Sequence, residues 1–257
     1  MQPATMTLMA LVLAHLLGDF PLQSHRLAAE KGQNFKLLAW HCILQYLLAW
    51  VCLLLFAPIA ILSLRNQAII LAYIATHLGI DWLKSTLQRR RLLPHDAKIF
   101  LLDQCLHAVA ILLAAMVLTR SDLHVFDLNL QVPPALKFRI LSTAIIYVAV
   151  VFGGGYLIRF IIKGLDKGAF RQGSEPVENA GLYIGWIERF LVITAMAMQS
   201  PALVGLILAG KSIARFPEFK ETRFAEYFLI GTLLSISLAT LGGLLLLQLW
   251  YGSIAFK

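Results

Sequence analysis

The sequence predicts an all-α fold: a polytopic integral membrane helix bundle with about eight transmembrane helices. Of the 257 residues, 59% are hydrophobic and only 14% are charged, and the mean hydropathy is +0.76. Soluble domains carry roughly 25% charged residues, so too few polar side chains remain here to cover a water-facing surface. The composition therefore excludes a soluble enzyme. The high apolar content also excludes a disordered chain.

Eight apolar stretches predict the individual helices, since about 20 apolar residues span a bilayer. The stretches cover approximately residues 5–20, 36–57, 66–87, 98–119, 138–162, 180–199, 201–215 and 224–250. No basic segment precedes the first stretch and no clear cleavage site follows it, so we expect a retained helix. The first and seventh stretches are short, and the seventh begins at Pro201 directly after the sixth. Seven spans plus a re-entrant segment is the alternative.

Basic residues are concentrated in every second connecting segment, and these segments lie on the same side of the predicted bundle. The segments after spans one, three, five and seven hold sixteen Lys and Arg residues, whereas the opposite side holds five. Basic residues collect in cytoplasmic loops, so both termini are expected to lie outside, in the periplasm of a bacterial inner membrane. The same bias explains the net charge of +8 without a nucleic-acid partner. Membrane lipids are the expected partners, and a homo-oligomer is left open.

A polar connection at residues 121–137 divides the expected bundle into two halves of four helices, residues 1–120 and 138–257. We find no convincing sequence repeat between the halves. They also differ in chemistry, because the histidines and aspartates at membrane depth lie in the first half.

Three His/Asp pairs with i,i+4 spacing lie within the first half: His15 with Asp19, His77 with Asp81, and Asp103 with His107. Each pair occupies one helix face. The third pair has the reverse order and lies on a helix of opposite direction. All three aspartates are therefore expected on the cytoplasmic side, with each histidine about 6 Å deeper. His41, near the start of the second span, falls in the same layer.

Ionisable side chains at membrane depth cost several kcal/mol and mark functional sites by default. Carboxylates and imidazoles together suit a divalent metal, here Zn, with Mn or Fe as alternatives. The predicted metal ligands are His15, Asp19, His41, His77, Asp81, Asp103 and His107. Asp81 and Asp103 are also the candidate catalytic residues. Gln23, Lys84 and Gln104 are candidates for binding substrate or supporting the ligands.

Polar residues of the second half have a structural interpretation. Pairing among the four charged residues of its spans would make them tolerable in a bundle: Glu188, Arg189, Lys211 and Glu226. Small residues recur every four positions and predict close helix packing: Gly231, Ser235, Ala239 and Gly243. Gly181 and Gly185 are expected to act in the same way.

The motifs HLLGDFPLQ, HLGIDWLK and FLLDQCLH, together with His41, resemble a bacterial inner-membrane family known as domain of unknown function 3307. The resemblance covers roughly residues 10–115. The later segments IGWIERF, AGKSIARF and AEYFLIGTLLS look like those of its longer members. The resemblance supports treating these His- and Asp-containing motifs as one pattern, but it implies no particular activity. The ligand types are also analogous to those of membrane-bound metal-dependent hydrolases such as the alkaline ceramidase-like group, without a match of motif.

Three functions remain open. A metal-dependent hydrolase would use the ion to activate water, and the position near the cytoplasmic face favours a lipid or lipid-linked substrate. A metal-ion or proton-coupled transporter would use the same residues as a transient site or relay. A non-catalytic scaffold or sensor would hold a structural metal. The sequence favours the hydrolase, although no nucleophile motif accompanies the cluster.

Overall fold

The computed structural model describes residues 3–23, 34–57, 59, 61–120, 132–165, 180–220 and 222–252. Within these ranges every regular element is a helix, as the sequence predicts. The chain divides into two compact units, Met1–Val148 and Ala149–Lys257, which are described separately. The polar connection at 121–137, which was expected to divide the chain, lies mostly outside the described residues.

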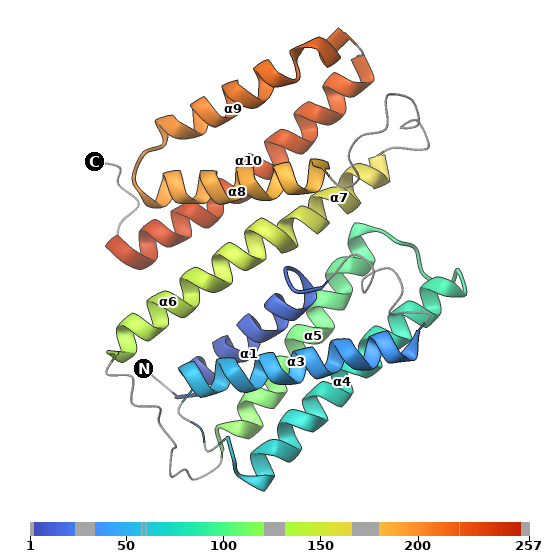
Figure 1. The fold of residues 1–257 in the computed structure, drawn as a ribbon, viewed down its shortest axis with the longest axis vertical. Coiled ribbons are helices and arrows are strands. Elements are labelled where there is room, and N and C mark those ends of the chain that lie inside the picture. Colours follow the sequence, from blue (N-terminus) through green and yellow to red (C-terminus); the bar gives the residue numbers. More distant parts are fainter. Residues whose placement is uncertain are drawn as a thin grey trace. The chain divides into compact units, whose positions relative to one another are not determined.

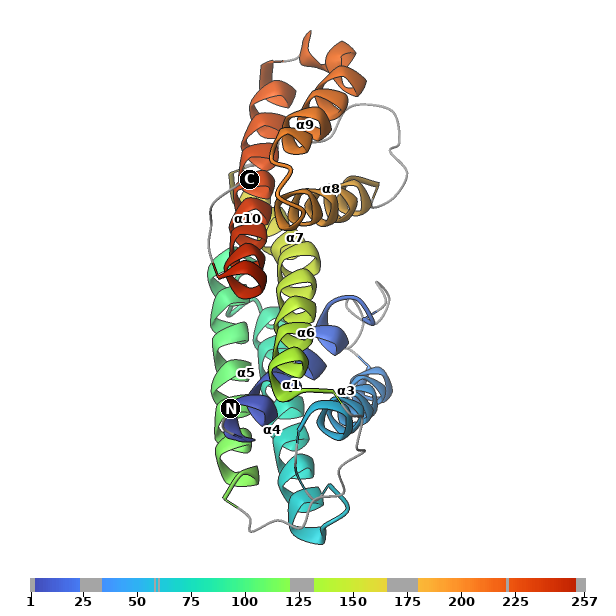
Figure 2. The ribbon, with the colours of Figure 1, turned by 90° about the vertical axis from the view of Figure 1, so that its left-hand side faces the viewer.

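Four helices form a closed ring in the first unit: α1 (Pro3–Asp19), α3 (Phe35–Phe56), α4 (Leu64–Arg89) and α5 (Ala97–Leu118). Contacts run from α1 to α3, from α3 to α4, from α4 to α5 and from α5 back to α1 (Figure 1 and Figure 2). A fifth helix, α6 (Pro134–Tyr147), packs against α1. Each ring helix therefore has two neighbours, and one side of each faces a common interior.

Side-chain caps and apolar residues explain why these segments form helices here. Asn34 accepts a hydrogen bond from the backbone N–H of Lys36 at the start of α3, and Asp96 caps α5 by accepting from the N–H of Ile99. Such caps satisfy N–H groups that the first helical turn leaves unpaired. The ring interior is apolar over most of its length, with these side chains fully buried: Leu11, Leu53, Ile70 and Leu118.

Four helical segments are long and apolar enough to cross a membrane: Phe35–Phe56, Ala97–Leu118, Pro134–Leu165 and Phe224–Tyr251. Two further apolar helices, Pro3–Asp19 and Ala202–Ala214, are shorter. The described helices thus fit a helical membrane protein, but only four of the eight expected spans meet these length and hydropathy criteria. Helix α4 has ample length, but polar residues interrupt its apolar sequence at both ends.

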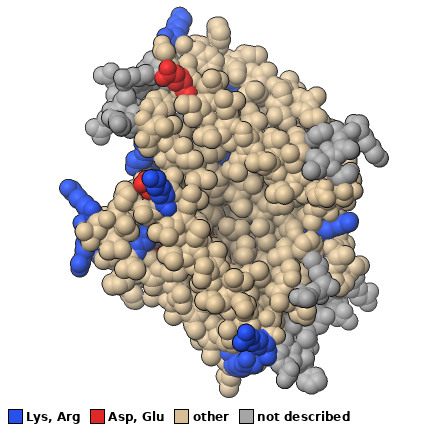
Figure 3. Space-filling model, turned by 180° about the vertical axis from the view of Figure 1, so that it is seen from behind, with Lys and Arg blue, Asp and Glu red and all other residues tan. Residues whose placement is uncertain are grey.

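Large apolar side chains on the outside of the helices agree with a lipid environment. Trp40, Leu64 and Leu106 are exposed on α3, α4 and α5. On the face drawn in Figure 3, most of the surface is neither basic nor acidic, and the Lys and Arg side chains lie in small groups toward its margins. A water-soluble protein would expose fewer contiguous apolar side chains.

The second unit is organised around one long helix, α10 (Thr222–Tyr251). It contacts α7 (Gly154–Leu165), α8 (Ala180–Ala197) and the 3₁₀ segment η2 (Phe216–Lys220). Helix α9 (Ala202–Ala214) packs against α8 (Figure 1). A π-helical segment, η1 (Val148–Gly153), runs directly into α7.

Small residues on α10 allow the close packing that their spacing predicts. Ala239 is fully buried, and a Cβ atom on Gly243 would overlap the side chain of Met196 from α8. A Cβ atom on Gly231 would lie 2.8 Å from Ile162 of α7. The prediction is wrong for Gly181, where an added Cβ would meet no described atom within 4 Å.

The four charged residues of the second unit, which were expected to pair with one another, form only one ion pair among the described contacts. Lys211 and Glu188 form an ion pair with an Nζ–Oε2 distance of 2.6 Å. The guanidinium of Arg189 instead donates two hydrogen bonds to the Val151 carbonyl, at 2.8 and 3.0 Å, and one to Ser235 Oγ. Glu226 is exposed. Arg189 is only 3% exposed, and a guanidinium on such a buried residue requires several hydrogen-bond acceptors.

Candidate metal centre

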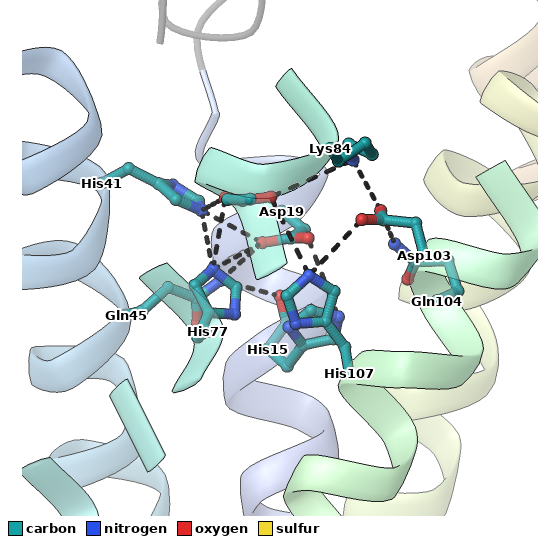
Figure 4. A network of polar contacts seen from close by, with 10 residues as sticks. His15, Asp19, His41, Gln45, His77, Lys84, Asp103, Gln104 and His107 are labelled. Atoms are coloured by element: carbon teal, nitrogen blue, oxygen red, sulfur yellow. Dashed lines mark hydrogen bonds and ion pairs between the residues drawn. The ribbon is translucent and has the colours of Figure 1, made fainter. Parts of the chain in front are cut away.

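The four ring helices bring the seven predicted ligands into one buried cluster. Figure 4 labels all of them except Asp81. Asp19 is the last residue of α1, and Asp103 lies seven residues into α5 from its start at Ala97. Each of the seven side chains belongs to a residue no more than 8% exposed: His15, Asp19, His41, His77, Asp81, Asp103 and His107. The antiparallel order of the ring therefore brings the three His/Asp pairs and His41 to one level.

Asp19, His41 and His77 form what we term the first corner. The Nε2 atoms of His41 and His77 are 3.1 Å apart, and Asp19 Oδ1 lies 3.2 Å from the former and 3.7 Å from the latter. Asp81 Oδ2 approaches the same two nitrogens at 3.5 and 3.6 Å. Four donor atoms at such separations could surround one small cation.

Asp81, Asp103 and His107 form the second corner. His107 Nε2 lies 3.8 Å from Asp81 Oδ1 and 3.7 Å from Asp103 Oδ1. The two oxygens of Asp81 thus face different corners. His15 lies alongside both, with its ring centroid 4.7 Å from that of His107 and 5.4 Å from that of His77.

The donor set fits a divalent metal. Within each of three triads, one ligand atom per residue lies within 4.8 Å of the other two: the first corner, the second corner, and His15 with His77 and His107. His107 is fully buried, and among the described residues neither of its ring nitrogens has a hydrogen-bond partner. Buried polar atoms are normally satisfied, so such a nitrogen requires an explanation, and a metal ion provides one.

Lys84 and Gln104, two of the three predicted substrate-binding residues, contact the second corner. Lys84 Nζ lies 2.7 Å from Asp103 Oδ2 and 3.9 Å from Asp81 Oδ1. Gln104 Nε2 donates to the same Asp103 oxygen at 3.2 Å. Gln23 lies in the turn beyond the end of α1 and is partly exposed.

The family described as Protein of unknown function (DUF3307) matches residues 7–132. This segment of the chain belongs to that family. Neither the curated proteins nor the solved structures contain a match to the chain. The DUF3307 segment confirms the resemblance that the motifs indicate, and it includes all seven clustered His and Asp residues.

Gln45 is a residue of the DUF3307 segment that the site prediction omits. Its amide nitrogen donates to Asp19 Oδ1 at 2.7 Å and to the His15 carbonyl oxygen at 3.3 Å. The neighbouring Gly18 leaves room for it, because a Cβ atom there would overlap the Gln45 amide. The available signal was the i,i+4 spacing of His41 and Gln45, which places both side chains on one face of α3.

Proposed function

We propose that this protein is a membrane-embedded, metal-dependent hydrolase whose divalent ion is held by the His/Asp cluster. One observation carries the proposal: seven His and Asp side chains from four helices meet in a buried cluster at the end of an otherwise apolar ring. Uncompensated carboxylates are costly in such a place. A bound Zn ion, or Mn or Fe, would offset that cost.

The chemistry of the donor atoms supports catalysis. A divalent ion held there would supply an activated water and an electrophile for an ester, amide or phosphoryl oxygen. Asp19, His41 and His77 are the proposed ligands at the first corner. Asp81 Oδ2 lies 3.5 and 3.6 Å from the two imidazole nitrogens, and we propose that it accepts a proton from a water at this corner. Asp103 orients Lys84 and Gln104 at the second corner.

The surroundings of the cluster support a lipid or lipid-linked substrate. We propose eight membrane-crossing helices in a bacterial inner membrane, with α1 and α9 as short spans and both termini in the periplasm. Lys84, Arg89 and Lys98 lie toward the same ends of α4 and α5 as the cluster. These ends face the basic loops that support a cytoplasmic side. A site at this depth would lie near the cytoplasmic interface, where water and the polar part of a lipid meet.

Metal content and hydrolysis, measured on the same detergent-purified full-length protein, test this function. The wild type, loaded with Zn, Mn or Fe, is incubated with lipid esters, amides and phosphoesters beside Asp81→Asn and His77→Ala. We expect turnover by the wild type, loss of both metal and turnover in His77→Ala, and loss of turnover with metal retained in Asp81→Asn. His95→Ala, an exposed histidine between α4 and α5, is the matched control.

Two other outcomes would replace the proposal. Metal-loaded wild type that hydrolyses none of the substrates, with His77→Ala changed only in stability, would indicate a structural metal in a scaffold or sensor. Ion or proton uptake by proteoliposomes that is lost in His77→Ala, again without hydrolysis, would indicate a transporter.

A further inference from the structure

Lys84 is a cation built into the cluster. Lys84 lies on α4 one turn after Asp81. Its ammonium forms an ion pair with Asp103, with an Nζ–Oδ2 distance of 2.7 Å. Asp81 Oδ1 lies 3.9 Å from the same ammonium. Lys84 therefore lies at the second corner and approaches Oδ1 of Asp81, whereas His41 and His77 approach Oδ2 of the same carboxylate. Figure 4 shows the Lys84 side chain beside Asp103.

We propose that the centre holds a single divalent ion, at the first corner, and that the Lys84 ammonium takes the second cation position beside Asp81 and Asp103. Lys84 then determines how many metal ions the protein binds. This inference rests on the metal site of the proposed function and adds the number of ions, their location and the residue that limits them.

Charge balance supports one ion and one ammonium. The cluster contains three carboxylates, from Asp19, Asp81 and Asp103, and its imidazoles are neutral when they act as ligands. One divalent ion and the Lys84 ammonium together balance these three negative charges. Two divalent ions with Lys84 would leave two excess positive charges among buried side chains, where unbalanced charge is expensive.

The orientation of Asp81 links the two cation positions. Its Oδ2 atom faces the first corner, and its Oδ1 atom lies 3.8 Å from His107 Nε2 and 3.9 Å from Lys84 Nζ. A carboxylate with one oxygen toward each of two cations is typical of sites that hold two metals close together. Without Lys84, the second corner would offer Asp81, Asp103 and His107 as three ligands within 4.8 Å of one another.

The number of metal ions bound per chain tests whether Lys84 occupies a cation position or only forms an ion pair with Asp103. Full-length protein in detergent is saturated with Zn²⁺, freed of excess metal by gel filtration and analysed by plasma mass spectrometry. We expect one ion per chain in the wild type, two in Lys84→Met, and one in Lys84→Arg, which retains the positive charge. The double variant Lys84→Met/Asp103→Asn should return to one ion, because the second corner has lost a ligand. Lys98→Met, an exposed lysine at the start of α5, is the control and should bind one.

The outcomes distinguish this inference from the proposed function. Two ions in the wild type, or one ion in Lys84→Met at saturation, would overturn the role of Lys84 and leave the metal-dependent function standing. No ion in the wild type after loading with Zn, Mn and Fe would overturn both. If Lys84→Met does not elute as a single species, Lys84→Gln removes the same charge with a polar side chain and is expected to bind two ions.

Discussion

The Nε2 atoms of His41 and His77 face each other at 3.1 Å, although the two residues lie 36 positions apart on different helices. Two nitrogen ligands of a tetrahedral zinc ion, each about 2.0–2.1 Å from the metal, are separated by about 3.3–3.4 Å. The observed separation is close to this value. It also suits an N–H···N hydrogen bond, which can hold the two rings in place when metal is absent.

His77→Ala is expected to abolish metal binding. It removes a nitrogen that lies 3.1 Å from His41 Nε2 and 3.7 Å from Asp19 Oδ1. At a free metal concentration 100 times its dissociation constant, one bound ion stabilises a folded protein by about 2.7 kcal/mol. Thermal unfolding with and without Zn²⁺ should show this gain in the wild type and in His95→Ala, but not in His77→Ala. An equal gain in all three proteins would contradict the prediction.

Gln45→Leu is expected to weaken metal binding through Asp19. The substitution removes the donor that lies 2.7 Å from Asp19 Oδ1 and leaves that carboxylate free to rotate. Loss of such a supporting hydrogen bond typically reduces metal affinity 10- to 100-fold. Zinc titration against a competing chelator measures the change. Gln88→Leu, at the exposed end of α4, is the control and should bind metal as tightly as the wild type.

Gly18→Ala is expected to act on the same hydrogen bond from the other side. The added methyl group would overlap the Gln45 amide and push it away from Asp19. Overpacking of this kind costs about 1–3 kcal/mol. Gly79→Ala on α4 is a sharp control, since its Cβ atom would meet no described atom within 4 Å. That variant should be neutral or more stable by up to about 1 kcal/mol, because alanine favours the helix. Equal stability of the two variants in thermal unfolding would refute the packing argument.

Arg189→Leu is expected to destabilise the second unit. The Val151 carbonyl in the π-helical segment would lose both of its guanidinium donors, and Ser235 would lose its partner. A buried acceptor left unsatisfied costs about 1–3 kcal/mol. Thermal unfolding should therefore occur at lower temperature than in Lys163→Leu, which changes an exposed cation on α7. Metal content should not change, because Arg189 belongs to the other unit.

Eight membrane crossings place the two termini on the same side of the membrane, whereas seven place them on opposite sides. Fusion of a reporter that is active only in the periplasm, at the N-terminus and separately at the C-terminus, is expected to give activity in both cases. A reporter fused after Arg91, in the basic segment between α4 and α5, should be inactive. Activity at only one terminus would favour seven spans and a re-entrant α9.

The helical class and the level of the His/Asp layer follow from the sequence because they depend on local properties. The high apolar content predicts a bilayer environment, where helices satisfy their backbone hydrogen bonds internally. The i,i+4 spacing places His77 and Asp81 on one helix face whatever surrounds the helix. The number of long spans was harder to predict. Length and hydropathy do not show whether a short helix such as α1, which ends at Asp19, crosses a membrane alone or within a bundle.

The sequence by itself determined a helical membrane protein with seven His and Asp residues at one depth. Only the tertiary structure decided which atoms meet. The helix ring turns the two Asp81 oxygens toward different corners, places Lys84 against Asp103 and inserts Gln45 over Gly18. These relationships depend on the rotation of each helix about its own axis. That rotation is set by the packing of all four ring helices together, and no single stretch of sequence encodes it.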